Sequence, residues 1–514
     1  MQHRATSGAS QFRPSEAGQR EVIAFLSDPA THGGAPVERV DTHISRIFLA
    51  GDRAWKLKRA LRTNYLDFST LHRRERMCRR ELEVNREAGD IYVGATPVVR
   101  RDGRLRLGGP GEPIEWLVEM RRFDRSRELD RLCDSGALTL PLIERLADEV
   151  AVLHRAAPEA PDFGDIEDLR ARIDQIAGAL VDAAGGSDLA AEVETWRSAA
   201  QEASRAQAGL IARRVRLGRV RRCHGDLHLG NVVMLGDRPT PFDAIEFNEA
   251  IASIDVLYDL ALTLSDLVVR GRADLANGLI NRYLGATRDY GGLPLMPLYL
   301  SMRGAVRAMT AAARGAPAEA ARDLEFAMEA LRPGRAARLI AIGGISGTGK
   351  STVARRLAPR LAPPLGAIVI RSDVVRKRLS GSRPEDRLPL EAYSPAMNRK
   401  VLARMAFDAR AALRAGAAVV LDATFLDAGA RGCAERIADS QGARFDGIWL
   451  EISTAAAIDR LSGRVGDASD ANADVVRRQV ERAASPIGWR IVDAGRPLAA
   501  VLADVRHGLN APAS

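Results

Sequence analysis

The 514-residue sequence has few cysteines, few aromatic residues and no long apolar run. No stretch approaches the roughly 18 consecutive apolar residues that a membrane-spanning helix needs, and residues 1–20 lack the apolar core of a signal peptide, so we expect a cytoplasmic protein with no membrane partner. The four cysteines contain no CxxC pair and support neither a disulfide framework nor a zinc site. With 46% hydrophobic and 27% charged residues, the composition is that of a folded chain.

Lysine is the scarcest basic residue. The 75 lysines and arginines include only five lysines, which leaves 75 − 5 = 70 arginines. The net charge of +9 is compatible with an anionic partner such as a nucleotide, a nucleic acid or a phosphorylated metabolite. We nevertheless attribute the arginine excess to codon usage rather than to one functional surface. Because arginine is the default here, each lysine indicates a site that requires a compact ammonium group.

Two patterns of predicted secondary structure divide the chain. Residues 1–36 are a tail and lead-in, and residues 37–330 begin with short strands around one helix and continue as helices. A β-rich island at residues 221–247 interrupts these helices. Proline and glycine in the linker 331–337 end the last helix. Residues 338–509 alternate strands with helices, which is typical of a parallel α/β sheet.

A glycine-rich motif opens this second half. The sequence GISGTGKS satisfies the GxxxxGK[ST] pattern, with an apolar strand before it and a helix-forming run after it. The glycines allow backbone N–H groups to face phosphate oxygens, and the helix N-terminus adds about half a positive charge. We expect Lys350 to reach the phosphates and Ser351 to bind Mg²⁺. The residues expected to contact ATP are Gly344, Ile345, Ser346, Gly347, Thr348, Gly349, Lys350, Ser351 and Thr352.

Polar residues at the ends of other strands complete this predicted site. Asp422 ends the strand VVLD, where it would bind Mg²⁺ or else cap the next helix. Asp373 is a candidate catalytic base with Arg376 holding an anionic acceptor, although Asp373 as a helix cap is the alternative. Arg460 and Arg464 lie four residues apart, and this spacing fits a lid over the triphosphate or a solvated basic face.

These residues resemble the P-loop kinase group that includes gluconate kinase, zeta toxin and the polynucleotide 5′-kinase domain. The resemblance covers about residues 338–509 and rests on the phosphate loop and on the segments SDVVRKRL, LDATF and RLSGRVGDASDA. It implies an α/β P-loop fold and ATP-dependent phosphoryl transfer. The acceptor is left open.

The β-rich island has the spacing of a different kinase site. Asp226 and Asn231 form the D-x-x-x-x-N pattern in which the aspartate accepts the hydroxyl proton and the asparagine binds Mg²⁺. Asp243 follows an apolar strand, in the place of a second metal-binding residue. Upstream, Lys56 matches the strand lysine that pairs the ATP phosphates, with Glu81 as its helix partner. The alternatives are a polar loop and a surface ion pair.

Together these features resemble the aminoglycoside phosphotransferase-like kinases. The segments THISRIFLAGDRAWKLKR and LDFSTLHRRERMCRRELEVN resemble more closely a bacterial group in which such a domain is fused to a C-terminal P-loop kinase. The resemblance implies an N-terminal α+β, protein-kinase-like fold with two lobes. HGD replaces HRD, DAIE replaces DFG, and no GxGxxG loop is present, which leaves the turn 42–45 to cover the phosphates.

Several nearby polar residues have structural explanations. We expect Lys58 to be solvated beside Lys56 and His224 to brace the island by hydrogen bonds. Asp255 and Asp259 are expected to start a helix and to anchor a loop.

The sequence therefore predicts two ATP- and Mg²⁺-dependent phosphotransferase domains that act on small hydroxylated molecules. A polynucleotide 5′-end kinase is an alternative for the C-terminal half, but nucleic acid is not favoured because no basic strip with interleaved aromatic residues is visible. The other alternative is a non-catalytic N-terminal sensor that regulates the C-terminal ATPase. The sequence does not identify the acceptors.

Overall fold

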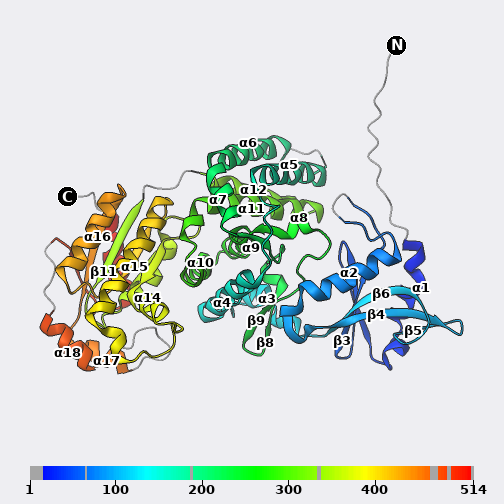
Figure 1. Cartoon of the computed structure of the whole chain (residues 1–514), viewed down its shortest axis with the longest axis horizontal. Helices are drawn as coiled ribbons and strands as arrows, with labels where there is room; N and C mark the ends of the chain where they lie inside the picture. The colour runs from blue at the N-terminus through cyan, green and yellow to red at the C-terminus, as the bar shows by residue number, and fades with distance from the viewer. Residues whose placement is uncertain are drawn as a thin grey trace, which may run out of the picture. The chain divides into compact units, whose positions relative to one another are not determined.

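The computed structural model describes residues 16–63, 66–185, 189–332, 337–462, 473–482 and 488–510 (Figure 1). Two compact units make up the chain. Unit 1 contains Met1–Leu138, Leu153–Gly164 and Val215–Asp259, and unit 2 contains Thr139–Val152, Asp165–Arg214 and Leu260–Ser514. No helix within the described ranges combines the length and apolar character that a membrane span requires.

A six-stranded antiparallel sheet dominates the start of unit 1. In spatial order its strands are β1 (Val37–Asp41), β2 (Ser45–Ala50), β3 (Arg53–Lys58), β6 (Glu112–Arg121), β4 (Tyr92–Arg101) and β5 (Arg104–Leu107). The β4–β5 hairpin turns at Asp102 and Gly103, whose φ angles are 51° and 72°, as its Asp-Gly sequence predicts.

A helix that the sequence did not predict lies in the lead-in. Helix α1 spans Arg20–Ser27, and its apolar residues Val22 and Leu26 are 2% and 0% exposed. They pack in one cluster with Leu57 of β3. Part of residues 1–36 therefore belongs to the core of the small lobe, because two apolar residues four apart form the buried stripe of a one-sided helix.

Helix α2 (Leu71–Val84) confirms the predicted helix beside this sheet and contacts β4 and β6. It begins at Thr70, whose hydroxyl oxygen accepts a hydrogen bond from a first-turn backbone N–H at 3.3 Å. Its buried residues are Arg74, Cys78 and Glu81, which share one helix face. The helix therefore directs a carboxylate toward the sheet.

Short strands and turns form the rest of unit 1. The β-rich island contains β7 (Val220–Arg222), β8 (Val232–Leu235) and β9 (Arg238–Pro241), and β7 pairs with β10 (Ser253–Asp255). The same unit contains the short helices α3 (Leu129–Asp134) and α8 (Glu249–Ala252), which contact these strands. Helices α4 (Leu140–Ala156) and α9 (Val256–Val269) each contribute residues to both units.

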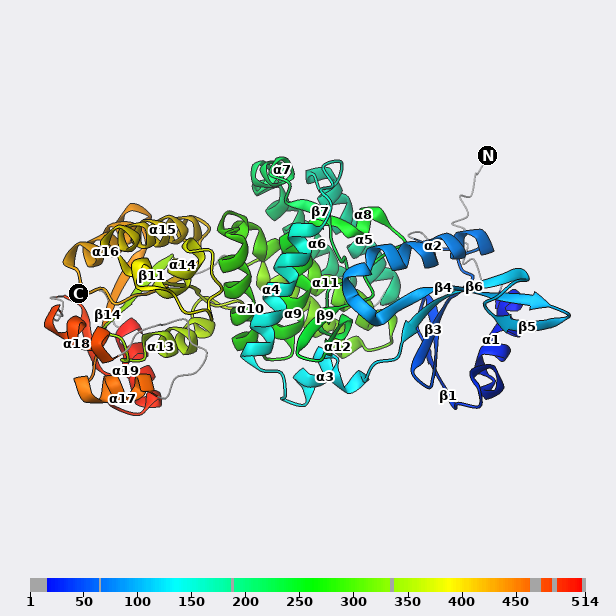
Figure 2. The same ribbon diagram turned by 60° about the horizontal axis from the view of Figure 1, so that its bottom comes forward.

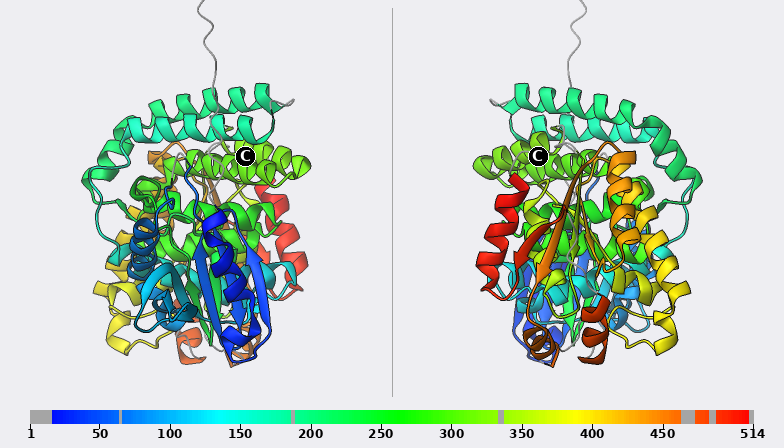
Figure 3. Two further views of the ribbon diagram at one scale, coloured as in Figure 1. Left: turned by 90° about the vertical axis from the view of Figure 1, so that its right-hand side faces the viewer. Right: turned by 90° about the vertical axis from the view of Figure 1, so that its left-hand side faces the viewer.

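Helices make up the first part of unit 2. They are α5 (Ile166–Ala183), α6 (Leu189–Ala206), α7 (Ala208–Arg216), α10 (Ala273–Thr287), α11 (Met296–Ala313) and α12 (Pro317–Ala330). Helices α5 and α6 lie side by side (Figure 3), and α11 packs against α5, α6 and α12. The indole N–H of Trp196 on α6 donates to the hydroxyl of Ser301 on α11 at 2.9 Å. This buried bond fixes α6 against α11.

A five-stranded parallel sheet forms the C-terminal part of unit 2, as the alternating pattern predicts. Its order is β12 (Ile368–Arg371), β13 (Val419–Asp422), β11 (Arg338–Gly343), β14 (Arg444–Glu451) and β15 (Arg490–Asp493). The central strand is fully buried at Ile340 and Ile342, which is typical of a sheet covered on both faces.

Helices cover both faces of this sheet (Figure 2). Helices α15 (Pro395–Arg414) and α16 (Ala428–Ser440) lie on one side, and α13 (Lys350–Leu357) and α19 (Leu498–Asn510) lie on the other. The remaining helices are α14 (Ser372–Leu379), α17 (Thr454–Ser462) and α18 (Ala473–Arg482). The loops at the carboxyl ends of the strands lead into these helices, which is where ligands bind in such folds.

Candidate active sites

The loop from Gly344 to Gly349 joins β11 to α13 and has a conformation that depends on glycine. Gly344 and Gly347 have φ angles of 134° and 89°. A Cβ atom at Gly344 would lie 2.5 Å from the backbone oxygen of Leu450, and one at Gly347 would lie 2.4 Å from that of Ala457. Neither position can accept a side chain without a backbone shift, so the loop can keep its N–H groups turned inward.

Lys350 and Ser351 follow this loop in the first turn of α13. Lys350 Nζ donates to the backbone oxygen of Ile345 at 2.7 Å, so the ammonium group lies over the loop. Ser351 Oγ donates to Asp422 Oδ2 at 2.6 Å. Serine and aspartate oxygens are hard ligands suited to Mg²⁺. The structure thus brings Ser351 and Asp422 together as the sequence predicts, and Thr352 lies exposed beside them on α13.

Arg371 is a residue of this site that sequence reasoning missed. Its Nε lies 3.2 Å from Asp422 Oδ2 and its Nη2 donates to Ser351 Oγ at 3.0 Å. Parallel pairing of β12 with β13 puts Arg371 opposite Asp422 at the strand ends. That register, which no local pattern reveals, is what brings the guanidinium to the candidate metal ligands.

Asp373 lies in the first turn of α14, next to the same strand end. Burial raises the pKa of its carboxyl group, and the negative charge of Asp422 raises it further, while Arg371 and Lys350 oppose the increase. A raised pKa makes this carboxylate a stronger base than an ordinary aspartate. The arrangement therefore suits a general base.

Arg376 lies one turn further along α14. Its Nη1 donates to the backbone oxygen of Ala392 at 2.8 Å, and its guanidinium lies 4.8 Å from the ring centroid of Tyr393. Burial lowers the pKa of Arg376. Its Nε is buried and has no hydrogen-bond partner among the described residues. Arg376 thus fixes the segment around η8 (Leu390–Tyr393) and retains one free donor.

The predicted lid is only partly described. Arg460 on α17 donates from Nη2 to the backbone oxygen of Ala494 at 2.8 Å, and Arg464 lies outside the described residues. Helix α18 provides a contact that the sequence did not suggest, because Gln479 Oε1 accepts a hydrogen bond from the backbone N–H of Ser346 at 2.7 Å. The Gln479 amide oxygen therefore accepts a loop N–H bond of the kind that a phosphate oxygen would accept.

A second group of charged residues lies in unit 1, between β3, α2 and the β-rich island. Lys56 Nζ lies 2.8 Å from Glu81 Oε1 and 2.5 Å from Asp243 Oδ1. Lys58 Nζ lies 2.5 Å from Glu81 Oε2 and is also paired with Glu246. The prediction that Lys58 is solvated is wrong, since its side chain is fully buried. Two lysines and three carboxylates form one cluster.

Burial and mutual attraction set the charge states in this cluster. Burial works against the charged form of Lys56, but Asp243 and Glu81 raise its pKa well above the ordinary value. Burial acts to raise the pKa of Asp243, and the attraction and hydrogen bond of Lys56 hold it below its ordinary value. Burial raises the pKa of Glu246 despite Lys58. The Lys56–Asp243 pair is therefore ionised near neutral pH.

The backbone positions Asp243 in an unusual conformation. Its φ angle is 63°, in the left-handed region that residues other than glycine rarely adopt. Its backbone N–H donates to the hydroxyl oxygen of Tyr92 at 3.0 Å. The sequence gave no indication of Tyr92, because the contact joins residues 151 positions apart. Strain of this kind is typical of functional sites.

Asp226 and Asn231 face each other across the island loop. Asn231 Nδ2 donates to the backbone oxygen of Asp226 at 2.9 Å and lies 3.3 Å from its Oδ2. The backbone N–H of Phe242 donates to the backbone oxygen of Asn231 at 2.9 Å. That bond sets Asn231 beside the strand that leads into Asp243. The loop therefore gathers one amide and two carboxylates, which are suitable Mg²⁺ ligands.

Asp259 anchors this loop, as expected. Its carboxylate accepts backbone N–H bonds from His224 at 3.2 Å and Gly225 at 2.9 Å, and it lies 3.1 Å from His154 Nε2. His154, Cys223 and Asp259 offer ligand atoms within 4.8 Å of one another. Both carboxylate oxygens of Asp259 are already engaged by the backbone, so the cluster is explained as structural.

His224 braces the loop from within. Its Nε2 lies 2.8 Å from the backbone oxygen of Phe242 and its Nδ1 accepts from the backbone N–H of Asp226 at 3.3 Å. Burial lowers the pKa of His224, which favours the neutral ring that both bonds require. His228 lies nearer the surface, with Nε2 3.6 Å from Asp226 Oδ2.

Comparison with known proteins gives matches in both halves of the chain. The family described as "Phosphotransferase enzyme family" matches residues 115–295, and the family described as "AAA domain" matches residues 339–486. The uncharacterized protein Rv2004c of Mycobacterium tuberculosis is 30% identical over 473 residues, which cover 88% of this chain and 92% of that protein. The uncharacterized protein Mb2027c of Mycobacterium bovis has the same identity and coverage.

Solved structures of two kinds resemble parts of this chain. A gluconokinase from Sinorhizobium meliloti 1021 has 23% identity and a TM-score of 0.26, covering 34% of this chain and 93% of that chain. A choline/ethanolamine kinase family protein from Mesorhizobium loti has 15% identity and a TM-score of 0.32, covering 61% of this chain and 99% of that chain.

The predicted fold is confirmed in both halves: a kinase-like N-terminal fold and a P-loop kinase fold with a parallel sheet. The 30% identity with Rv2004c extends over most of both chains. The chain belongs to the same family as Rv2004c and is an ATP-dependent kinase in which a phosphotransferase domain precedes a C-terminal P-loop domain.

Proposed function

We propose that each of the two domains transfers the γ-phosphoryl group of ATP to a hydroxyl group of a small molecule. The N-terminal domain corresponds to residues 37–330 and the C-terminal domain to residues 338–509, joined by the linker 331–337. The observation that carries the proposal is the pairing of Lys56 with both Glu81 and Asp243 beside the Asp226 loop. A buried lysine that is paired with two carboxylates can bind phosphate oxygens when one of the carboxylates binds a metal ion instead.

In the N-terminal domain, Lys56 binds the α- and β-phosphates and Glu81 holds the ammonium group in place. Asp226 accepts the proton of the acceptor hydroxyl. Asn231 and Asp243 hold Mg²⁺, which neutralises charge on the β- and γ-phosphates when it is bound. These residues supply positioning and electrostatic stabilisation, which provide most of the catalysis in phosphoryl transfer.

In the C-terminal domain, the loop Gly344–Ser351 and Thr352 hold the triphosphate, with Lys350 turning from Ile345 toward the phosphates. Ser351 and Asp422 hold Mg²⁺. Asp373 is the base, since its buried carboxyl group has a raised pKa and lies beside the loop. Arg376 uses its free Nε to hold an anionic acceptor. Arg460 closes over the triphosphate as part of a lid.

A screen of labelled ATP against hydroxylated metabolites tests this proposal. The acceptors include sugars, sugar acids, amino alcohols, aminoglycosides and a 5′-hydroxyl oligonucleotide, and the full-length chain is compared with Asp226→Asn and Lys350→Ala. Each variant is expected to lose transfer to one acceptor by about 100-fold or more and to keep transfer to the other. The controls are Asp237→Asn, in an exposed turn, and Lys400→Ala, exposed on α15.

The outcomes separate the remaining possibilities. Transfer to the oligonucleotide alone would favour an end kinase. If Asp226→Asn leaves all phosphoryl transfer intact while Lys350→Ala abolishes it, the N-terminal domain is not a catalyst and the proposal fails for that half.

One observation supports a sensor role as the second candidate for the N-terminal domain. The turn 42–45 between β1 and β2 stands where kinases carry a glycine-rich loop. Its side chains close it locally, because Thr42 Oγ1 accepts from the Ser45 backbone N–H at 2.9 Å. A turn satisfied by its own side chain offers fewer free N–H groups to phosphates. ATP binding without turnover by this domain would support the sensor role.

A further inference from the structure

Helix α10 docks on the edge of the parallel sheet within unit 2. Asn277 Nδ2 donates to the backbone oxygens of Leu365 and Ala367 at 2.7 and 3.0 Å. Asn281 Nδ2 donates to Ala367 O at 3.2 Å, while its Oδ1 accepts from the Val369 backbone N–H at 2.6 Å. Two side-chain amides therefore satisfy the backbone groups that an edge strand leaves free. This contact fixes α10 beside β12 and α14.

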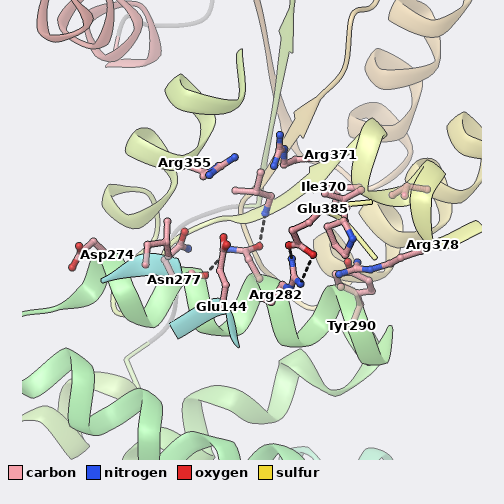
Figure 4. Close-up of a pocket in the computed structure, with 18 residues that line it drawn as sticks. Glu144, Asp274, Asn277, Arg282, Tyr290, Arg355, Ile370, Arg371, Arg378 and Glu385 are labelled. Carbon is pink, nitrogen blue, oxygen red and sulfur yellow. Dashed lines mark hydrogen bonds and ion pairs between the residues drawn. The ribbon is translucent and has the colours of Figure 1, made fainter. Parts of the chain in front are cut away.

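A cavity of about 130 Å³ remains between α10, β12 and α14 (Figure 4). A space of this size holds several water molecules, since one water needs only about 10–15 Å³ on this measure. Arg371, Arg378 and Tyr290 are among its lining residues, whereas the phosphate loop Gly344–Ser351 does not line it in the described part of the chain. The cavity therefore adjoins the P-loop site through Arg371, but the phosphate loop itself does not line it.

Arg378 is a positive charge in this cavity that has no carboxylate partner among the described residues. Arg282 is paired with Asp148 at 2.5 Å and Glu385 at 2.8 Å, and Arg371 is paired with Asp422. Among the described residues, Arg378 has no hydrogen bond from its guanidinium and no ion pair. It lies against the backbone of α10, where a Cβ atom on Gly285 would be 2.1 Å from its Nη1.

Tyr290 provides a second polar group next to Arg378 (Figure 4). Its side chain is 6% exposed, and its hydroxyl has no hydrogen-bond partner among the described residues. Burial raises the pKa of Tyr290 to about 12, so the hydroxyl remains a donor. Burial also lowers the pKa of Arg378 to about 10, which still leaves it charged near neutral pH.

The carboxylates around this end of the cavity are ion-paired with other arginines. Glu385 is bound to Arg282, and Asp408, whose charge acts on Tyr290 and on Arg378, is ion-paired with Arg404 at 2.7 Å, while its Oδ1 has no hydrogen-bond partner among the described residues. Glu144 lines the cavity away from Arg378 (Figure 4). A half-buried guanidinium without a carboxylate partner and a tyrosine hydroxyl, both lining one cavity, are groups that an anionic ligand satisfies.

We propose that this cavity is a binding site for a phosphate group, held by the Arg378 guanidinium and the Tyr290 hydroxyl. The ligand is inorganic phosphate or the phosphate of a small phosphorylated metabolite. Arginine is the preferred partner of phosphate because its planar fork matches two oxygens. The site is separate from the two proposed transfer sites and does not require that either one is active.

Titration calorimetry with the full-length chain tests this site. Saturating AMPPNP and excess Mg²⁺ first fill the nucleotide sites, and inorganic phosphate or glycerol 3-phosphate is then added. One equivalent of phosphate is expected to bind wild type. Arg378→Met is expected to weaken binding by about 10-fold or more, and Tyr290→Phe by about 2- to 10-fold, through loss of hydrogen bonds. The relative affinities of the two probes identify which source of the phosphate group fits.

The matched control is Arg356→Met, which removes an exposed arginine of α13 that does not line the cavity. It should bind phosphate like wild type. If Arg378→Met does not fold, Tyr290→Phe alone decides, because it keeps the ring. The proposal is overturned if wild type binds no phosphate at about 20 mM, or if both cavity variants bind it as tightly as the control.

Discussion

Glu81 lies between two lysines, with one carboxylate oxygen 2.8 Å from Lys56 Nζ and the other 2.5 Å from Lys58 Nζ. The two lysines have different second partners, because Lys56 also pairs with Asp243 and Lys58 also pairs with Glu246. Lys58 therefore holds Glu81 in place from the buried side, while Lys56 faces the island loop. Lys58 is a positioning residue in this arrangement.

Replacing Lys58 with methionine should destabilise the chain strongly. The substitution leaves Glu81 and Glu246 buried with less compensating charge, and breaking a buried ion pair from one side costs about 3–5 kcal/mol. Urea unfolding of Lys58→Met measures the loss. The control Lys400→Met removes an exposed lysine and should change stability by less than about 0.5 kcal/mol. A neutral effect of Lys58→Met would show that the lysine is dispensable, and adding Glu246→Gln should recover part of the loss.

Replacing Asp259 with asparagine should impair the N-terminal site, although Asp259 is not one of the residues proposed to bind phosphate or metal or to accept the proton. Asp259 accepts two backbone N–H bonds from the loop that carries Asp226, and one amide oxygen cannot accept both equally well. We expect a loss of about 1–3 kcal/mol in stability and about 10-fold or more in turnover by this domain. The exposed Asp237→Asn change serves as the control. Unchanged turnover in a folded Asp259→Asn variant would contradict the anchoring role.

The raised pKa of Asp373 predicts that the difference in stability between wild type and Asp373→Asn depends on pH. Burial raises its pKa above the ordinary value of 3.8, so the folded state binds the proton more tightly than the unfolded state. Its contribution to stability is therefore complete below pH 3.8 and is lost as the pH rises through the folded-state pKa. Asp373→Asn should melt above wild type at neutral pH, and the difference should disappear as the pH falls below about 3.8.

The same variant should lose C-terminal phosphoryl transfer by about 100-fold or more if Asp373 is the base. Melting curves at a series of pH values, with exposed Asp439→Asn on α16 as the control, separate the two effects. An Asp373→Asn protein less stable than wild type at neutral pH would contradict the stability argument.

The position of Arg371 predicts that replacing it changes the affinity of the C-terminal site for Mg²⁺. Its guanidinium binds Ser351 and Asp422, so a cation at those oxygens meets a nearby positive charge. Arg371→Met should lower the Mg²⁺ concentration for half-maximal nucleotide binding by about 10-fold. Titration of Mg²⁺ against fluorescent ADP measures this, with Arg356→Met as the control. A higher Mg²⁺ requirement in Arg371→Met would mean that Arg371 supports the metal site instead of opposing it.

Motif spacing alone predicted the residues that a single turn or loop brings together. The phosphate loop with Lys350 and Ser351 and the Asp226–Asn231 loop depend on contacts within a few residues, and the strand and helix periodicities around them are equally local. The alternation of strands and helices predicted the parallel sheet, and the resemblance of the N-terminal motifs to aminoglycoside phosphotransferase-like kinases implied the kinase-like fold. The scarcity of lysine drew attention to Lys56 and Lys350, which lie in the two clusters, but it did not distinguish them from Lys400, which is exposed on α15.

Tertiary structure decided what lies opposite these local motifs. Lys58 is buried and not solvated because α2 and Glu246 cover its face of β3, and Arg371 reaches Asp422 only through the β12–β13 register. Tyr92 meets Asp243, and Asn281 meets β12, across long stretches of sequence. The periodicity of apolar residues shows which face of a helix or strand is buried. It does not show which residue packs against that face, because this depends on how elements distant in sequence pack together.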